Sequence, residues 1–256
     1  MEDFVREGSI VKSIWSKSDT VLFIFAGSSA EFALNKAVDW LYFTGKLPAN
    51  PIERFLSTVS YAGLIIFSPK DQAVSAINKL RSIHSAIEHS RQSVIPDWAY
   101  RDVLFMLIYY SIASFELLDR KLTHAEKEEV FNVFYEVGNK MGLTNLPANY
   151  DDWLIARAEH LKKDIQLSTY SKDLFKQYRK HLGLFRFILL KNVQAQIVPG
   201  EVRTLLKLKK SGLFFLVILT YRFLRKVRGL LFIKFLLLPA KYRSQIKALE
   251  LKTVNI

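Results

Sequence analysis

The stretch from Asn50 to His89 constrains the fold most, because it contains two helix starts, each followed by apolar residues at helical spacing. Asn50 stands directly before Pro51, and Glu53 follows three residues after Asn50. An N-cap residue, a proline in the first turn and a carboxylate at this distance are typical of a helix N-terminus. The pattern therefore predicts a helix that begins at Pro51.

The first helix places Arg54 and Thr58 on one face, because residues four apart are neighbours on a helix surface. For an arginine at such a position the ordinary role is an ion pair with a carboxylate, and Asp39 and Asp71 are the candidates. Spacing alone favours this structural role for Arg54.

A second start at Ser68-Pro69 leads into a segment whose apolar positions are three or four residues apart. The residues of this stripe are Ile77, Leu80, His84 and Ile87. His84 thus lies on the apolar face of the predicted helix and not on its solvent-exposed face. A single histidine on such a face is most often a core residue, so its spacing alone does not make it a ligand.

The rest of the chain also has helical patterns and few turn residues, with 10 Gly and 7 Pro in 256 residues. We expect one buried or partly broken helical unit from Thr20 to about Phe43, and a long buried helix over 97–118. Core packing is the expected role of Tyr109 and Tyr110 in this helix, and a hydroxyl in a pocket is the alternative. Thr123 with Glu126 forms a second capping box, and Asn149 precedes a further helix. The sequence predicts an all-α fold: a single globular helical domain of about eight or more helices.

The net charge of +13 is concentrated near the C-terminus. Residues 1–200 contain 24 Lys and Arg and 22 Asp and Glu, whereas residues 201–256 contain 13 and 2. We therefore divide the chain into a helical core, 1–200, and basic, apolar C-terminal helices, 201–256, which complete the domain. Basic and apolar character together favour an anionic membrane surface, contacted through 207–243. We do not expect nucleic acid as a partner, because no RNA-binding motif is present.

The apolar stretch 212–238 is interrupted by four cations at its centre, which makes a single transmembrane helix costly. An interfacial hairpin or amphipathic anchor fits better, and a pair of core helices in a soluble fold is the other alternative. The first residues are acidic and lack the basic start of a secretory signal. We expect a cytoplasmic protein, or one peripheral at the cytoplasmic face of a membrane.

Several kinds of metal or thiol chemistry have no support in the sequence. The chain contains no cysteine, which excludes disulfides, thiolate nucleophiles and cysteine-bound metals. His160 and His181 have no metal-ligand spacing with each other or with a carboxylate motif, and His89 lies on a different helix face from His84.

Several short motifs, taken together, resemble one family. They are Arg54-x-x-x-Thr58, Ile83-His84-x-x-Ile87, Arg120-Lys121-Leu122-Thr123-x-x-Glu126, Gly142-Leu143, Leu146-Pro147-Ala148 and Leu237 to Arg243. In this order and spacing they resemble the bacterial rubber oxygenases (latex-clearing proteins) and the fungal mycophenolate-pathway, or MpaB-like, oxygenase. The resemblance spans roughly residues 15 to 250.

This resemblance implies an all-α protein that binds haem b and cleaves carbon–carbon double bonds with dioxygen. It implies His84 as the axial iron ligand, and Arg54 and Thr58 as residues that orient the haem or dioxygen. The substrate would be lipophilic, either a small isoprenoid or lipid-like molecule or a polymer. The alternatives are a non-catalytic haem-binding family member and a cofactor-free helical protein associated with membranes.

The chain departs from the family pattern at three places. Relatives often have a His-Pro pair where this chain has Glu31-Phe32-Ala33-Leu34. A lysine that can precede the threonine of the first motif is replaced by Ser57, and the predicted helix 97–118 has no histidine. For these reasons the non-catalytic alternative stays open.

Overall fold

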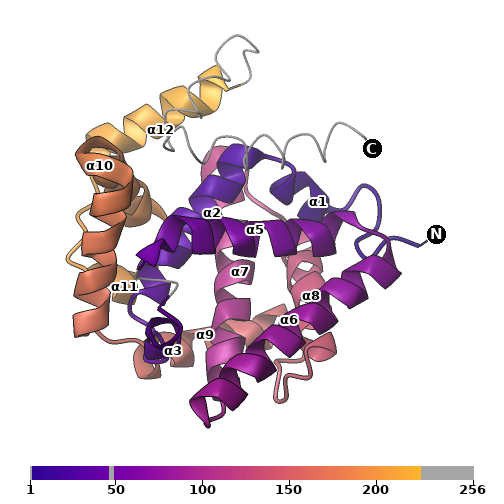
Figure 1. Ribbon diagram of the computed structural model, residues 1–256. Coiled ribbons are helices and arrows are strands. Elements are labelled where there is room, and N and C mark those ends of the chain that lie inside the picture. The colour runs from indigo at the N-terminus through magenta and orange to yellow at the C-terminus, as the bar shows by residue number, and fades with distance from the viewer. Residues whose placement is uncertain (1, 46–48, 226–256) are drawn as a thin grey trace.

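The computed structural model describes residues 2–45 and 49–225, and every regular element in these ranges is a helix (Figure 1). The helices are α1 (Ile10–Trp15), α2 (Ser18–Phe32), α3 (Asp39–Phe43), α5 (Pro51–Phe67), α6 (Lys70–Arg91), α7 (Asp97–Leu118), α8 (His124–Lys140), α9 (Tyr150–Lys163), α10 (Thr169–Ile197), α11 (Gly200–Leu205) and α12 (Gly212–Leu224). The all-α prediction is confirmed.

Helices α2 and α7 form the most extensive helix pair in the described part of the chain, and the other helices surround them. The close approach depends on Gly27 of α2, because a Cβ there would lie 2.2 Å from two ring carbons of Tyr110 on α7. Tyr110 is completely buried. The long apolar helix expected over 97–118 is thus correct in its bounds and in its central position.

The unit expected from Thr20 to Phe43 is broken, as its pattern indicated. After α2 ends, a turn of the chain precedes the short helix α3. Asn35 organises this turn: its Oδ1 accepts a hydrogen bond from the backbone N–H of Ala37 at 2.7 Å. The backbone N–H of Gln166 donates to the carbonyl of Leu34 at 2.7 Å, which joins the turn to the segment after α9.

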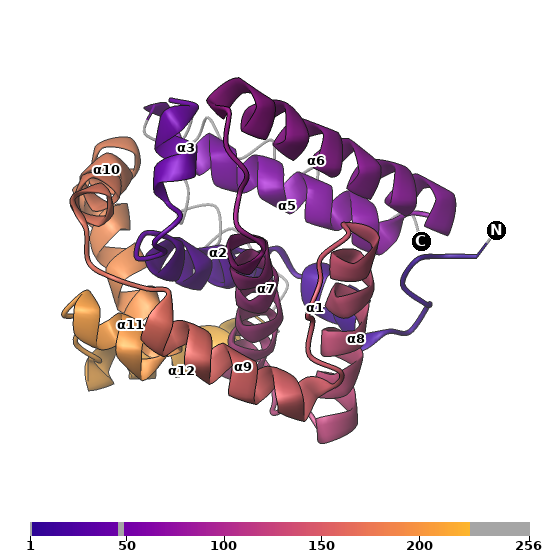
Figure 2. The same ribbon diagram turned by 90° about the horizontal axis from the view of Figure 1, so that it is seen from below.

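Helices α5 and α6 lie side by side and cover one face of the central pair (Figure 2). The Oδ1 of Asn50 accepts from the N–H of Glu53 at 3.3 Å, with Pro51 in the first turn, so the predicted helix start is confirmed. α6 begins at Lys70 with Pro69 as its N-cap, so Ser68 does not cap it. Instead, the carbonyl of Ser68 accepts from the N–H of Phe4.

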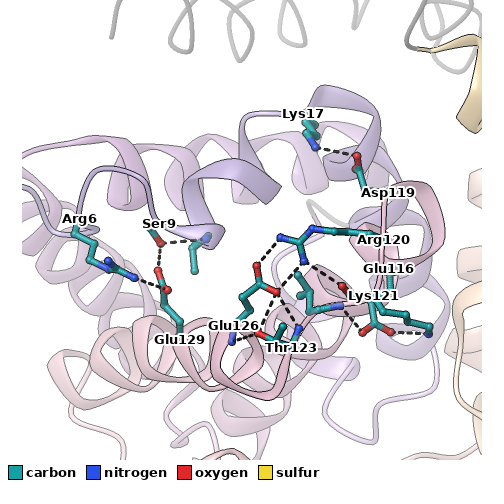
Figure 3. Close-up of polar contacts among 12 residues, drawn as sticks. Arg6, Ser9, Lys17, Glu116, Asp119, Arg120, Lys121, Thr123, Glu126 and Glu129 are labelled. Carbon is teal, nitrogen blue, oxygen red and sulfur yellow. Dashed lines mark hydrogen bonds and ion pairs between the residues drawn. The ribbon is translucent and has the colours of Figure 1, made fainter.

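The capping box of Thr123 and Glu126 starts α8, and Arg120 joins it with hydrogen bonds of 2.5 and 2.8 Å to the Glu126 carboxylate (Figure 3). One turn further along, Glu129 accepts from Arg6 at 2.7 Å and from Ser9 at 2.5 Å. These contacts fix the N-terminal segment against α8 (Figure 3).

Helices α11 and α12, the last two of the described part, pack into the same hydrophobic core as the helices before them. Val202, Leu208 and Ile218 are buried in the same hydrophobic cluster as residues of α1 to α9. α12 is tied to α7 by Arg225, whose side chain lies 3.3 Å from both Asp19 and Asp119. The division at residue 200 stays a prediction.

None of the helices described for 2–45 and 49–225 is long and apolar enough to cross a membrane. Of the apolar stretch 212–238, residues 226–238 lie outside the described residues, as do the motif Leu237 to Arg243 and residues 226–243 of the range 207–243.

We expect Gly27→Ala to lower the free energy of unfolding by about 2 kcal/mol, since overpacking a close contact costs roughly 1–3 kcal/mol. The ring of Tyr110 would have to move, although alanine is the better helix former. Urea unfolding measures the change. Gly200→Ala is the matched control, because a Cβ there meets no atom within 4 Å. Equal stabilities of the two variants would contradict the close approach of α2 and α7.

Candidate functional site

A cavity with a volume of about 260 Å³ lies between α2, α3, α5, α6, α7 and α8. Since one water-sized sphere needs ~10–15 Å³ by this measure, the cavity has room for a substantial ligand. Its walls are mostly aliphatic and aromatic. An enclosed apolar cavity with a few polar groups is the usual form of a small-molecule site.

The three residues that the sequence singled out line this one cavity: Arg54 and Thr58 from α5, and His84 from α6. α5 and α6 pack side by side, so the shared face of Arg54 and Thr58 meets the apolar stripe of α6. Leu80 and Ile87, which belong to the same stripe, also line the cavity. The helical spacing thus predicted a surface that the tertiary structure turns into a cavity wall.

His84 has the properties of a metal-binding imidazole. Its Nδ1 is buried and has no hydrogen-bond partner in the described structure. Burial lowers the pKa of His84, the charge of Arg54 lowers this pKa further, and Glu88 acts in the opposite direction. The ring is therefore neutral at physiological pH, the state in which histidine binds metals.

The ring of His84 is held in place by Tyr100, whose ring centroid lies 5.1 Å away. Tyr100 in turn donates a hydrogen bond from its hydroxyl to Glu88 at 3.2 Å. Glu88 also accepts from the backbone N–H of Ile95 at 2.9 Å. One carboxylate of α6 thus fixes both the start of α7 and the aromatic neighbour of His84.

Arg54 brings a positive charge to the cavity wall. Its Nη1 lies 3.4 Å from the Oγ of Ser57, and burial lowers its pKa. In the described part of the chain no aspartate or glutamate pairs with it, and Asp39, one of the two expected partners, pairs with Arg91 at 2.6 Å. The expected structural ion pair of Arg54 is therefore absent there. A partly buried cation without a counter-ion favours an anionic ligand.

Ser57, which stands where relatives can have a lysine, makes its hydrogen bonds within its own helix. Ser57 donates a hydrogen bond to the carbonyl of Arg54 at 2.8 Å and does not line the cavity. Thr58 donates to the same carbonyl at 3.2 Å and does line it. A hydroxyl that donates to the backbone can still accept, so Thr58 can receive a hydrogen bond from a ligand.

Glu31, the first residue of the stretch Glu31 to Leu34, belongs to a buried ion pair. Its carboxylate receives two parallel hydrogen bonds of 2.5 Å from Arg157 of α9 and one of 2.9 Å from the hydroxyl of Tyr110. Burial raises the pKa of Glu31, but Arg157 and His160 together lower it to about 2. Glu31 is therefore ionised and paired with Arg157, and the hydroxyl of Tyr110 donates a further hydrogen bond to its carboxylate.

His160 lies beside this pair and contacts two more carboxylates. Its Nδ1 bonds to Asp102 of α7 and lies 3.3 Å from Asp164, while its Nε2 lies 3.8 Å from Glu31. Burial lowers the pKa of His160, but the nearby carboxylates of Asp102 and Glu31 raise it to about 9 overall. His160 is thus a cation that balances buried carboxylates.

The sequence analysis missed this cluster. Donor atoms of Asp102, His160 and Asp164 lie within 4.8 Å of one another, an arrangement that could hold a metal ion. The i, i+4 spacing of His160 and Asp164 was a signal in the sequence, whereas Asp102 joins them only through packing. The cluster reaches the cavity through Asn35, which lines it and donates to Asp102 at 2.8 Å.

The comparisons agree with the motifs. The family described as "ER-bound oxygenase mpaB/B'/Rubber oxygenase, catalytic domain" matches residues 18–245, which is most of the chain. Searches of curated proteins and of solved structures found no match. The matched range includes all the helices that line the cavity. The chain therefore belongs to the mpaB and rubber oxygenase family, of which it contains the catalytic domain.

Proposed function

We propose that this oxygenase-family protein binds haem b and uses it to cleave or oxidise carbon–carbon double bonds of a lipophilic, isoprenoid or lipid-like substrate. His84 is the proposed axial ligand of the iron. The observation that carries the proposal is the neutral, unpartnered Nδ1 of His84 beside a large apolar cavity that Arg54 and Thr58 also line. The family match supports the oxygenase class.

The residues present fit a haem. Haem is a mostly apolar disc with anionic propionates, and it needs an axial ligand, apolar walls and a cation. His84 offers the ligand atom, the aliphatic and aromatic lining offers the walls, and Arg54 offers the unpaired charge. Bound haem would supply the dioxygen chemistry, which the protein chain by itself lacks.

The chain's own residues would bind and orient the haem and would exclude water from the cavity. The neutral imidazole of His84 would hold the iron of a bound haem, and the ring of Tyr100 packs against the imidazole. Thr58, whose hydroxyl donates to the carbonyl of Arg54, can accept a hydrogen bond from a polar group in the cavity. No aspartate or glutamate from 2–45 or 49–225 lines this cavity, so we assign no general base.

The non-catalytic alternative is favoured by one observation. Glu31 belongs to the stretch Glu31 to Leu34, where relatives often have a His-Pro pair; its carboxylate is bound by Arg157 and Tyr110 and does not line the cavity. A family member that binds haem without turnover would have the same His84 geometry. Haem content with product analysis separates the two, because only the catalytic protein consumes dioxygen and forms carbonyl products from an unsaturated substrate.

We also propose that the protein contacts an anionic membrane surface through the first part of 207–243, on the cytoplasmic side. Lys207, Lys209 and Lys210 are exposed just before α12. On α12 itself, Leu213 and Phe223 are 75% and 74% exposed. Lysines attract anionic headgroups, and apolar side chains enter the interface. Arg222 and Arg225 are not part of this proposed membrane surface, because both donate hydrogen bonds to backbone carbonyls at the end of α7.

We expect His84→Ala to lower the haem content by on the order of tenfold or more, because the axial ligand is lost. The measurement is the absorption spectrum and haem content of protein expressed with a haem supply. His89→Ala, on the exposed side of the same helix, is the control and should keep the haem of the wild type. Full haem in folded His84→Ala would refute the ligand assignment.

We expect Arg54→Gln to weaken haem binding by roughly tenfold, as for the loss of a charge-assisted hydrogen bond of about 1.5 kcal/mol. Arg54→Lys, which keeps the charge, should lose less. Haem titration of the apoprotein measures both. In the same haem-free samples the pKa of His84, followed by NMR, should rise in Arg54→Gln, because a neighbouring positive charge is removed. Equal affinities of wild type and Arg54→Gln would remove Arg54 from the site.

We expect replacement of Lys207, Lys209 and Lys210 by glutamine to lower binding to phosphatidylserine-containing liposomes about a hundredfold at low salt, at ~1 kcal/mol per lysine. Co-sedimentation measures the partition. The control replaces Lys172, Lys176 and Lys180, three exposed lysines of α10. An equal loss in both triple variants would indicate a general charge effect and contradict a defined membrane surface.

A further inference from the structure

A second pocket lies next to the cavity of His84, between α2, α5 and α10, and has a volume of about 110 Å³. Most of its lining is apolar, with Leu22 from α2, Leu56 from α5, and Leu182 and Leu189 from α10 among the walls. By the measure of ~10–15 Å³ for a water-sized sphere, it has room for several methylene groups.

Two aromatic rings separate this pocket from the larger cavity. Phe25 and Phe55 are the two residues that line both spaces. Their ring centroids lie 6.2 Å apart at an angle of 60°. Phe55 also packs on the fully buried Tyr178 at 6.0 Å. These two rings thus form the wall that the two spaces share.

The outer end of the pocket lies at a break in α10. Gly183 has φ +76° and ψ 166° inside this helix, values that interrupt the helical path. Leu182, before the break, and Leu189, after it, both line the pocket. The residues that follow the break expose apolar side chains to solvent: Phe185 is 73% exposed and Ile188 is 51% exposed. An apolar surface thus adjoins the pocket.

We propose that the pocket between α2, α5 and α10 binds one hydrocarbon arm of the substrate, with Phe25 and Phe55 as the partition between that arm and the cavity of His84. This inference rests on the proposed function. A chain that is attacked at an internal double bond has an arm on each side of that bond, and this pocket, next to the cavity of His84, provides room for one of them. The exposed apolar surface after Gly183 is the side from which the chain enters.

The proposal is tested by the chain-length dependence of binding. Saturated fatty acids of 8 to 18 carbons displace a fluorescent apolar probe, anilinonaphthalene sulfonate, from protein expressed with a haem supply. Each buried methylene should raise the affinity by about fourfold. Leu189→Trp fills the pocket from α10, and Leu22→Trp fills it from α2, both at half-buried positions that tolerate a larger side chain.

In the wild type we expect the affinity for the fatty acids to increase with their chain length. In Leu189→Trp and Leu22→Trp this increase should stop at a chain several carbons shorter than in the wild type. Leu154→Trp, at an exposed position of α9, is the control with the wild-type profile. Circular dichroism and thermal unfolding identify variants that fold. An unchanged profile in a folded Leu189→Trp or Leu22→Trp would overturn the proposal.

Haem content, measured on the same samples, separates this proposal from the proposed function. Haem-loaded protein whose variants keep the wild-type profile refutes the hydrocarbon pocket and leaves the haem assignment standing. Protein that takes up no haem but shows the shortened profile in the variants refutes the haem assignment, while the pocket remains a binding site for a hydrocarbon chain.

Discussion

The carboxylate of Glu31 lies in the centre of the molecule and is fully buried, and its two hydrogen bonds of 2.5 Å from Arg157 join α2 to α9. Tyr110 adds a bond from α7, so three helices meet at one charge. Two buried charges are costly unless their geometry is bidentate and their other polar atoms are satisfied. This requirement fixes the relative position of the three helices more narrowly than apolar packing alone, which is nondirectional.

The cavity depends on that arrangement. α2 contributes Phe25 to its wall and α7 contributes Tyr100, so both sides of the space are set by helices that the ion pair holds. Asn35 connects the two features directly, because it lines the cavity and donates to Asp102 in the buried cluster. Glu31, Arg157, Asp102 and His160 thus lie beside the cavity, paired with one another, and the wall itself is mostly apolar apart from Arg54.

Helices α5 and α6 provide the opposite wall and its chemistry. Their local signals are strong: a capped start at Pro51 and an apolar stripe that includes His84. Arg54 is left without a carboxylate in the described structure because Asp39 is already paired with Arg91. Charge and imidazole in one apolar space suit an anionic, apolar cofactor such as haem, which is the group that the family resemblance implies.

The sequence by itself determined the helical class, the caps at Asn50 and Thr123, and the faces on which Arg54 and His84 lie. These features depend on residues within about four positions of each other, where helix geometry leaves little freedom. The family motifs were readable for the same reason, because each one is short and local.

Only the tertiary structure decided which faces meet. Glu31 and Arg157 are 126 positions apart, and no local pattern marks them as partners. The same holds for Asp102 with His160, and for the two rings of Phe25 and Phe55. Contacts at this separation follow from how helices pack around a shared core, where shape and charge pairing over the whole molecule, and not spacing along the chain, select the partner.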